Sequence, residues 1–216
     1  MNERMLRIDI YSDVICPWCY VGKRRLEKAL SLLDGTLRTK VTWRPFQLNP
    51  TMPKEGMERT EYLTAKFGSV ETYVRVVEDQ IVAAGSDEPI PFAFGKIART
   101  PNTFLAHRLI WYGEQQGCQN ELVELLFKSY FQNGADIGSR DVLAGLAEQV
   151  GLTAEAFVFG DEGTAEVQSE EAVGRRLGIR SVPCFVLDQT YSIHGAQPPE
   201  LLADAIHEVW SNKKTT

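Results

Sequence analysis

The chain is short of cysteine and histidine and has no long apolar run, and each shortage excludes a class of protein. Its 216 residues include four cysteines and three histidines. These are too few for a scaffold held together by disulfides, and apart from Cys16 and Cys19 they lack the paired spacing of a zinc site. No apolar run approaches the ~18 to 20 residues that cross a bilayer. Repeats, low-complexity tracts and Gly/Ser linkers are also missing, so the 44% of apolar residues can build the core of an ordinary globular protein.

Basic residues are outnumbered, 23 against 29 acidic ones, which gives a formal net charge of -6. A surface of this sign repels phosphate backbones and anionic lipids, so we expect neither a nucleic-acid partner nor a membrane partner. Charged residues interrupt the segment Met1–Asp9 before the apolar region of a signal peptide could form. We therefore expect a soluble, cytoplasmic protein.

The start of the chain changes its hydrophobic period twice. Leu6–Tyr11 alternates apolar and polar residues, which predicts a strand, and apolar residues at helical spacing predict a helix through Leu26–Leu33. Val41–Arg44 is rich in residues that favour strands and predicts a second strand, which ends at Pro45. The chain is thus predicted to open with a β-α-β unit.

The middle of the chain has almost no strand signal. Helical spacing predicts several helices there, one of them capped by Asn102 or Thr103, one running over Asn120–Phe131 and one capped by Ser139. Because strand patterns are so scarce in this stretch, we expect it to form a small helical domain.

The end of the chain returns to mixed structure. A short polar helix is predicted over Glu166–Leu177, followed by two β-rich runs, Cys184–Leu187 and Tyr191–His194. Pro198-Pro199 then opens an amphipathic helix, since proline is well tolerated in a first helical turn.

Along the whole chain, the predicted order is β-α-β, a helical block, then α-β-β-α. This order indicates an α/β fold that a helical module interrupts. We expect the α/β domain to comprise residues 1–50 and 165–216, and the inserted all-helical domain to comprise residues 51–164.

The sequence Cys16-Pro17-Trp18-Cys19 lies between the end of the first predicted strand and the start of the first predicted helix. At a helix N-terminus, unpaired N–H groups and the helix dipole favour a thiolate and can lower a cysteine pKa below its free value of ~8.5. We therefore expect Cys16 to be the exposed attacking thiolate and Cys19 to resolve the mixed disulfide. Pro17 and Trp18 would tune the reduction potential. A structural zinc site and two inert buried thiols are the competing interpretations, and the strand-to-helix context favours the redox one.

Two other features bear on this motif. The basic residues Lys23, Arg24 and Arg25 follow one turn later, where they form either an ordinary solvated helix face or an additional influence that favours the Cys16 thiolate. Further along, the sequence Ser181-Val182-Pro183-Cys184 places a proline just before a predicted strand, as expected for a turn or a first strand residue.

These stretches together resemble the DsbA-like branch of the thioredoxin superfamily, and most closely the FrnE-like cytosolic oxidoreductases. The resemblance runs nearly end to end. Its most specific stretches are Ser12-Asp13-Val14-Ile15-Cys16-Pro17-Trp18-Cys19-Tyr20, Trp43-Arg44-Pro45-Phe46-Gln47-Leu48, Arg99-Thr100-Pro101-Asn102-Thr103, Asp136-Ile137-Gly138 and Gly195-Ala196-Gln197-Pro198-Pro199-Glu200. It implies a thioredoxin fold whose inserted helical domain forms one wall of an active-site groove. It also implies a cis Val182–Pro183 bond near Cys16, with the main chain of Val182 pairing with an extended substrate peptide.

The chain departs from the family pattern at two positions. Thioredoxin-like enzymes often hold a buried acid on the first strand, six residues before the attacking cysteine, where this chain has Ile10. Asp9 is one residue off and faces the other side of a strand, so we expect it to be a surface or ion-paired carboxylate. Cys184 stands where the FrnE-like relatives usually have a bulky apolar residue. It is either a small buried hydrophobe or an accessory thiol that forms an alternative disulfide.

Other candidate residues receive weaker assignments. Cys118 gets no role, and the three histidines have no partner that spacing identifies. Asn102 is expected to cap its helix, although the corresponding region approaches the ligand in glutathione-using relatives.

The functional prediction is a thiol–disulfide oxidoreductase that acts on protein or small-molecule disulfides. It would need no metal and no organic cofactor, with glutathione as a candidate co-substrate. The alternative is a glutathione-dependent isomerase or a kappa-class-like glutathione transferase. Those relatives typically have a serine at the position of Cys16 and lack the second cysteine. A third class is a binding module or chaperone whose groove holds unfolded peptide without turnover.

Overall fold

The structure is a computed structural model that describes residues 5–33, 35, 37–86, 88 and 90–212. Residues 1–4, part of the segment in which no signal peptide was expected, lie outside the described residues. Within the described ranges, no helix is both long and apolar enough to cross a membrane.

A four-stranded sheet forms the α/β part of the molecule. Its strands are β1 (Leu6–Ser12), β2 (Thr39–Pro45), β5 (Cys184–Leu187) and β6 (Tyr191–His194). They lie in the order β2-β1-β5-β6, with β1 parallel to β2 and the other neighbours antiparallel. Each strand expected from the sequence is therefore present, and β1 is central because both of its edges are paired.

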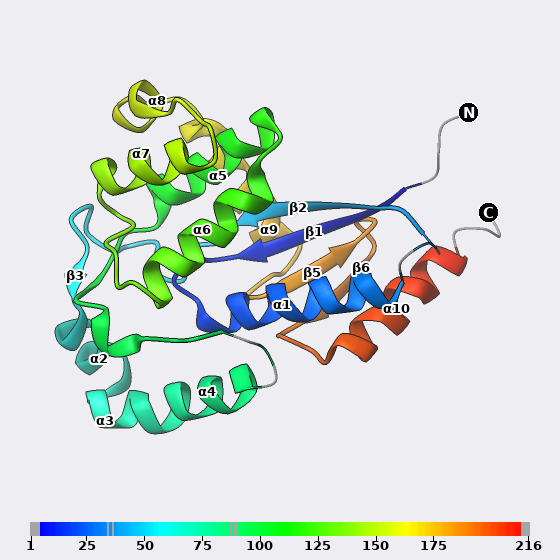
Figure 1. The fold of residues 1–216 in the computed structure, drawn as a ribbon, viewed down its shortest axis with the longest axis horizontal. Helices are drawn as coiled ribbons and strands as arrows, with labels where there is room; N and C mark the ends of the chain where they lie inside the picture. The colour runs from blue at the N-terminus through cyan, green and yellow to red at the C-terminus, as the bar shows by residue number, and fades with distance from the viewer. Residues whose placement is uncertain (1–4, 34, 36, 87, 89, 213–216) are drawn as a thin grey trace.

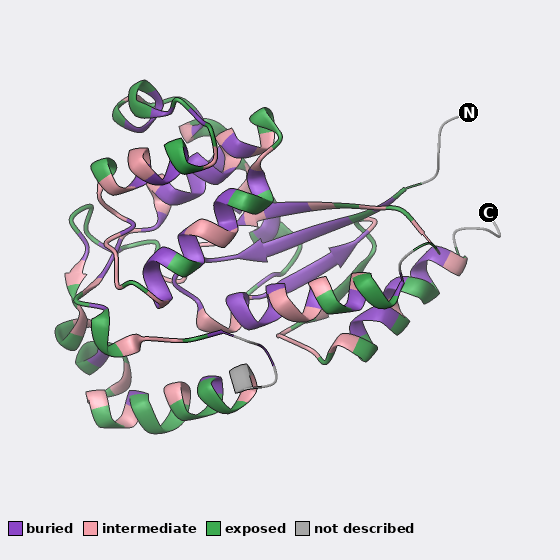
Figure 2. Cartoon of the chain, viewed as in Figure 1, coloured by how far each residue is buried: buried purple, intermediate pink, exposed green. Residues whose placement is uncertain are grey.

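Helices cover both faces of this sheet. Figure 1 shows α1 (Pro17–Leu32) and α10 (Pro199–Asn212) side by side on one face, and α9 (Thr164–Arg176) behind the sheet. Figure 2 shows β1 and β5 buried along nearly their whole length, whereas the helices alternate between buried and exposed residues. This is the burial expected of a sheet with covered faces.

The inserted segment between β2 and α9 is mainly helical, as expected. Its helices and helical turns are α2 (Arg59–Phe67), α3 (Val70–Tyr73), a π-helical turn (Val74–Glu78), α4 (Asp79–Ser86), a 3₁₀ turn (Phe94–Lys96), α5 (Phe104–Gln116), α6 (Gln119–Phe131), α7 (Arg140–Gln149) and α8 (Glu155–Phe159).

The expected all-helical insertion also contains a short antiparallel ribbon, which corrects one detail of the prediction. The ribbon pairs β3 (Met57–Glu58) with β4 (Arg99–Thr100). Strands of two residues are too short to show an alternating pattern, so the sequence carried no periodic signal for them. Gly56 allows the close approach: it has a φ of 71°, and a Cβ at this position would lie 2.7 Å from the carbonyl oxygen of Thr100.

One apolar cluster joins the insertion to the sheet. Ile8 and Ile10 of β1 belong to the same buried cluster as Leu126 and Phe127 of α6. The ring of Tyr20 on α1 stacks on Phe127 at a centroid distance of 4.9 Å. The insertion therefore packs directly against the helix that carries the cysteine motif.

The start of α5 is capped by Asn102, one of the two residues expected to do so. Its side-chain oxygen accepts a hydrogen bond from the Phe104 N–H at 2.9 Å, and its amide group donates to the carbonyl of Met52 at 2.7 Å. The Thr103 side chain makes no capping hydrogen bond. Asn102 thus fixes the start of α5 against the loop at Met52.

Candidate functional site

The cysteine motif forms the first turn of α1, directly after the turn that follows β1. The Cys16 N–H donates to the carbonyl of Asp13 at 3.0 Å, and Cys16 is the N-cap residue with an extended backbone. Pro17 occupies the first helical position, where no N–H is needed. Cys16 therefore lies at the end of the helix where N–H groups are unpaired.

The two cysteines of the motif are free thiols that differ in burial. Cys19 is completely buried at 0% exposure, and Cys16 is 5% exposed. Burial and the neighbouring Cys16 sulfur raise the pKa of the Cys19 thiol well above its ordinary value. Cys16 is more enclosed than the exposed thiolate that the sequence suggested, because the loop at Val182 lies against it.

The loop before β5 brings a proline to the same place. The Val182–Pro183 peptide bond is cis. The Cys16 thiol faces the carbonyl oxygen of Val182 at 3.7 Å. The structure thus brings together Cys16, Val182 and Pro183, which lie far apart in the sequence.

A glycine of α1 makes the close packing of this loop feasible. Gly22 lies one turn after Cys19, and a Cβ at this position would lie 2.9 Å from Cγ of Pro183 and 3.3 Å from Cζ of Phe185. A larger residue could fit only if α1 or the proline loop moved. The distance between helix and loop therefore depends on this position having no side chain.

Cys184 is not brought together with the redox pair. Successive strand residues face opposite sides of a sheet. Phe185 packs toward Gly22 on the α1 side, whereas Cys184 belongs to a separate buried cluster with Tyr11, Ile179 and Val186. Burial raises the pKa of the Cys184 thiol to about 11. Its surroundings match those of a small buried hydrophobe, and the role of accessory thiol stays a prediction.

Cys118, for which no role was expected, lies at the start of α6. Its thiol is partly buried, and its pKa is raised by burial and by the carboxylate of Glu121.

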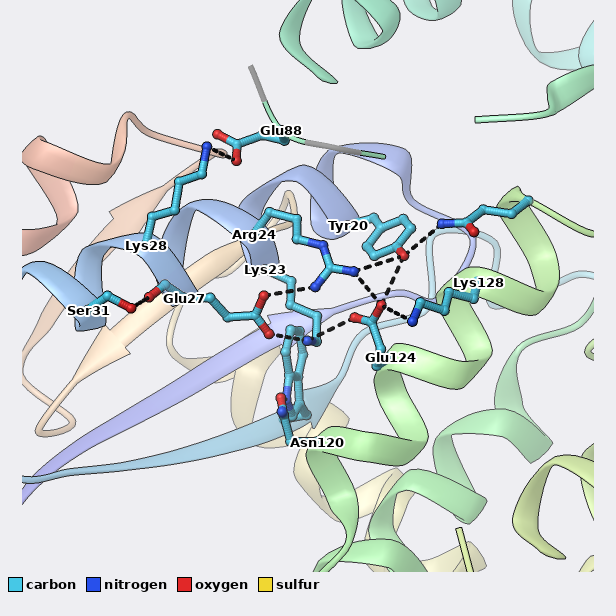
Figure 3. Close-up of polar contacts among 12 residues, drawn as sticks. Tyr20, Lys23, Arg24, Glu27, Lys28, Ser31, Glu88, Asn120, Glu124 and Lys128 are labelled. Atoms are coloured by element: carbon cyan, nitrogen blue, oxygen red, sulfur yellow. Dashed lines mark hydrogen bonds and ion pairs between the residues drawn. The ribbon is translucent and has the colours of Figure 1, made fainter. Parts of the chain in front are cut away.

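The basic residues after the motif are ion-paired, so they are not a solvated helix face. Lys23 is only 3% exposed, and its ammonium group pairs with Glu124 at 2.9 Å and with Glu27. Arg24 pairs with the same two carboxylates. Figure 3 shows both cations lying between Glu27 on α1 and Glu124 on α6. Their charges are therefore used to join the motif helix to the insertion.

Two further residues of α1, Tyr20 and Arg25, also connect this helix to other parts of the chain. The Tyr20 hydroxyl donates to Glu124 at 3.1 Å and accepts from Gln132 at 3.0 Å, and burial raises its pKa to about 12. Arg25 donates to the carbonyl of Ala196 and lies 3.5 Å from Glu88. Three consecutive basic residues thus attach α1 to three other parts of the chain.

Asp9 was expected to be either a surface carboxylate or an ion-paired one. It is ion-paired, and it is buried. Its carboxylate accepts a hydrogen bond from Arg44 at 2.8 Å. Arg44 also pairs with Glu170 of α9 at 2.8 Å, on the face of the sheet away from α1. Ile10 is buried in the apolar cluster that also contains Cys16 and Cys19. The position at which related enzymes hold a buried acid therefore carries no carboxylate here.

Sequence reasoning missed a buried pair of ionisable groups next to the motif. Asp13 is 0% exposed and His107 of α5 is 3% exposed, and Asp13 Oδ1 lies 3.4 Å from His107 Nε2. Asp13 Oδ2 accepts a hydrogen bond from the Leu48 N–H at 2.7 Å. Asp13 was part of a recognised stretch, but no spacing rule links it to a histidine on a distant helix.

Within the described part of the chain, no cluster of three or more His, Cys, Asp or Glu side chains is placed to hold a metal ion. That the cysteine pair works without a metal or an organic cofactor stays a prediction.

Comparisons with known proteins agree with this geometry. The family model of the DSBA-like thioredoxin domain matches residues 7–207. An uncharacterised protein of Bacillus subtilis, YwbO, is 26% identical over 216 residues, which is 96% of this chain and 99% of that protein.

Solved structures resemble the chain over nearly its full length. A probable DsbA oxidoreductase from Streptomyces coelicolor is similar with a TM-score of 0.84 and 32% identity, covering 95% of this chain and 90% of that one. The cytosolic disulfide reductase DsbM of Pseudomonas aeruginosa, in its structure with glutathione, is similar in fold, with a TM-score of 0.65, 16% identity and coverage of 94% and 98%. A 2-hydroxychromene-2-carboxylate isomerase has a TM-score of 0.72 at 15% identity and coverage of 97% and 99%.

Proposed function

We propose that this chain, which belongs to the family of DSBA-like thioredoxin domains, exchanges thiols and disulfides through Cys16 and Cys19. One observation carries the proposal. Two free thiols share the first turn of α1, and the Cys16 sulfur lies 3.7 Å from the main chain of Val182, beside Pro183. This arrangement supplies an attacking sulfur, a resolving sulfur one turn away and a main-chain edge for substrate.

The reaction proceeds in two exchanges. Cys16 attacks one sulfur of a substrate disulfide, which forms a mixed disulfide and releases the first substrate thiol. Cys19 then attacks the Cys16 sulfur, the Cys16–Cys19 disulfide forms and the second substrate thiol leaves. The substrate disulfide gains two electrons and the cysteine pair loses two. The reverse sequence oxidises a dithiol, so direction depends on the reduction potential of the pair relative to its surroundings. Pro17 and Trp18 tune that potential.

The substrate is a protein or small-molecule disulfide. The carbonyl of Val182 stands beside Cys16, where an extended peptide can pair with it by strand addition. Glutathione is a second candidate partner, and the glutathione in the fold relative DsbM makes it a reasonable first probe. In the cytoplasm, where thiols are kept reduced, the resting form would be the dithiol.

The glutathione-dependent isomerase alternative is less well supported. The fold resembles one such isomerase, but a resolving thiol beside the attacking one has no part in a reaction that holds glutathione non-covalently. Cys19, fully buried against Cys16, is better explained by disulfide exchange.

Reduction of a self-quenched, dye-labelled glutathione disulfide tests the proposal, with dithiothreitol as the electron source. We expect Cys16→Ser to lower the catalysed rate by at least about a hundredfold because the attacking sulfur is lost. We expect Cys19→Ser to accumulate the mixed disulfide. Cys118→Ser, which changes a partly buried thiol outside the site, is the matched control and should retain activity. Undiminished turnover by Cys16→Ser would refute the proposal.

A further inference from the structure

Three buried polar atoms beside the redox pair have no hydrogen-bond partner. They are Ser12 Oγ, Asp13 Oδ1 and His107 Nε2. Buried polar groups are almost always satisfied, and an unsatisfied group often marks a site with a chemical task. Two of the three atoms, Asp13 Oδ1 and His107 Nε2, face one another at 3.4 Å.

The segment Ser12-Asp13 adjoins both cysteines. The Asp13 carbonyl accepts the Cys16 N–H at 3.0 Å. The main chain of Asp13 and the side chain of Ser12 lie close enough to Cys19 to favour its charged form. The Leu48 N–H holds the other oxygen of the Asp13 carboxylate at 2.7 Å. The carboxylate is thus oriented, with Oδ1 directed toward His107.

The resolving step needs a group that can take a proton. Cys19 is fully buried, and burial raises its pKa, so it enters the reaction as a thiol. It attacks a disulfide only as a thiolate, and water does not reach it directly. Ile10 offers no acid or base. The proton must therefore pass to another buried group close by.

We propose that the Asp13 carboxylate, paired with His107, takes up the proton that Cys19 loses when it resolves the mixed disulfide. This inference rests on the proposed thiol–disulfide exchange and assigns a proton acceptor within it. Ser12 precedes Asp13 in the chain, its side chain lies near Cys19, and its hydroxyl can both donate and accept, so it can relay the proton.

The step balances as follows. The Cys19 S–H bond breaks and its proton moves to the Asp13–His107 pair. The Cys19 sulfur forms a bond to the Cys16 sulfur, and the bond between Cys16 and the substrate sulfur breaks. The substrate leaves as a thiolate, which takes a proton from the pair or from water, so the pair returns to its starting state. In the reverse direction the pair returns the proton to Cys19.

Few other ionisable groups face this site. Cys16 is on the same helix as Cys19, Asp13 lies in the turn after β1, and His107 is on α5. From α9, the carboxylate of Glu171 accepts the Gln47 N–H at 3.1 Å, one residue before the Leu48 contact of Asp13. Glu171 is therefore a buried carboxylate that supports the same loop without belonging to the unsatisfied group.

The test separates the two exchanges in time. Reduced protein is mixed with glutathione disulfide and quenched with acid at intervals, and intact mass distinguishes the mixed disulfide from the Cys16–Cys19 disulfide. We expect Asp13→Asn and His107→Gln to slow the resolving step at least about tenfold below neutral pH. Formation of the mixed disulfide should stay within about twofold of wild type. The deficit should shrink as pH rises, because hydroxide that reaches Cys19 when the site opens transiently then competes with the pair as proton acceptor.

Glu171→Gln is the matched control and should leave both steps unchanged. Wild-type resolution rates across the pH range in both Asp13→Asn and His107→Gln would overturn the inference, and so would equal slowing of both steps. If Asp13→Asn does not fold, His107→Gln alone decides. A wild-type protein that never forms the Cys16–Cys19 disulfide would instead refute the proposed function.

Discussion

Replacing Gly22 by alanine perturbs the contact on which the site depends most. The glycine lies on α1 where the helix meets the proline loop, and an added Cβ would lie 2.9 Å from Cγ of Pro183. The atom it meets belongs to a stiff ring, so the overlap cannot be relieved by turning a flexible side chain. Either α1 or the loop must move.

Two opposing effects set the size of the change. Alanine in place of glycine stabilises a helix interior by about 0.5–1 kcal/mol. Overpacking a close-packed site costs about 1–3 kcal/mol. We therefore expect Gly22→Ala to change the free energy of unfolding by between about zero and a loss of about 2 kcal/mol. Because Pro183 would shift relative to Cys16, disulfide exchange should also slow.

Gly145→Ala is the control, since Gly145 lies inside α7 and an added Cβ would meet nothing within 4 Å. It should stabilise the protein by about 0.5–1 kcal/mol. Urea unfolding of both variants measures the difference, which we expect to be about 1–3 kcal/mol in favour of Gly145→Ala. Equal stabilisation by the two substitutions, with unchanged exchange rates, would refute the packing of α1 on the proline loop.

Three further predictions test other parts of the structure. Glu124→Gln should destabilise the protein by about 2–4 kcal/mol in urea unfolding, because it removes one of the two carboxylates that a buried lysine and an arginine share and leaves them only Glu27. Lys128→Met changes a residue that is 51% exposed and pairs with the same Glu124, so it should lower the free energy of unfolding by about 1 kcal/mol or less. Equal losses for Glu124→Gln and Lys128→Met would contradict the central place given to Glu124 in this cluster. Asp9→Asn should lower the free energy of unfolding, because Arg44 loses the charge of one of its carboxylate partners, and it should leave exchange rates unchanged. A loss of activity without a loss of stability would show that Asp9 takes part in the chemistry. Burial raises the pKa of Cys184 to about 11, so between pH ~9 and ~11 the unfolded chain releases this proton and the folded protein keeps it. The stability of reduced protein should then fall with rising pH by about 1.4 kcal/mol per unit for this thiol. Cys184→Ala should flatten that slope, and an unchanged slope would contradict the burial assigned to it.

Local patterns in the sequence were sufficient to predict most of the strands and helices of the fold. Alternation predicted β1, and helical spacing predicted the helices that pack on it, because both patterns report which face of an element is buried. The position of Cys16 followed from its place between a strand and a helix. The ribbon of β3 and β4 could not be predicted, since two-residue strands carry no periodicity.

Contacts between distant elements were the part that the sequence could not supply. The pairing of Asp13 with His107 and of Lys23 with Glu124 joins residues on different elements, and no spacing rule connects them. The placement of Cys184 was accessible in principle. Once Pro183 was taken to pack near Cys16, strand alternation already placed the next side chain on the opposite face.

A redox titration in defined glutathione buffers, with acid trapping and intact-mass readout, tests the central claim most directly. We expect Cys16 and Cys19 to convert together between dithiol and intramolecular disulfide, at a potential between ~−120 and ~−270 mV. A stable glutathione adduct on Cys16, with Cys19 remaining a free thiol at every ratio of glutathione to its disulfide, would contradict it.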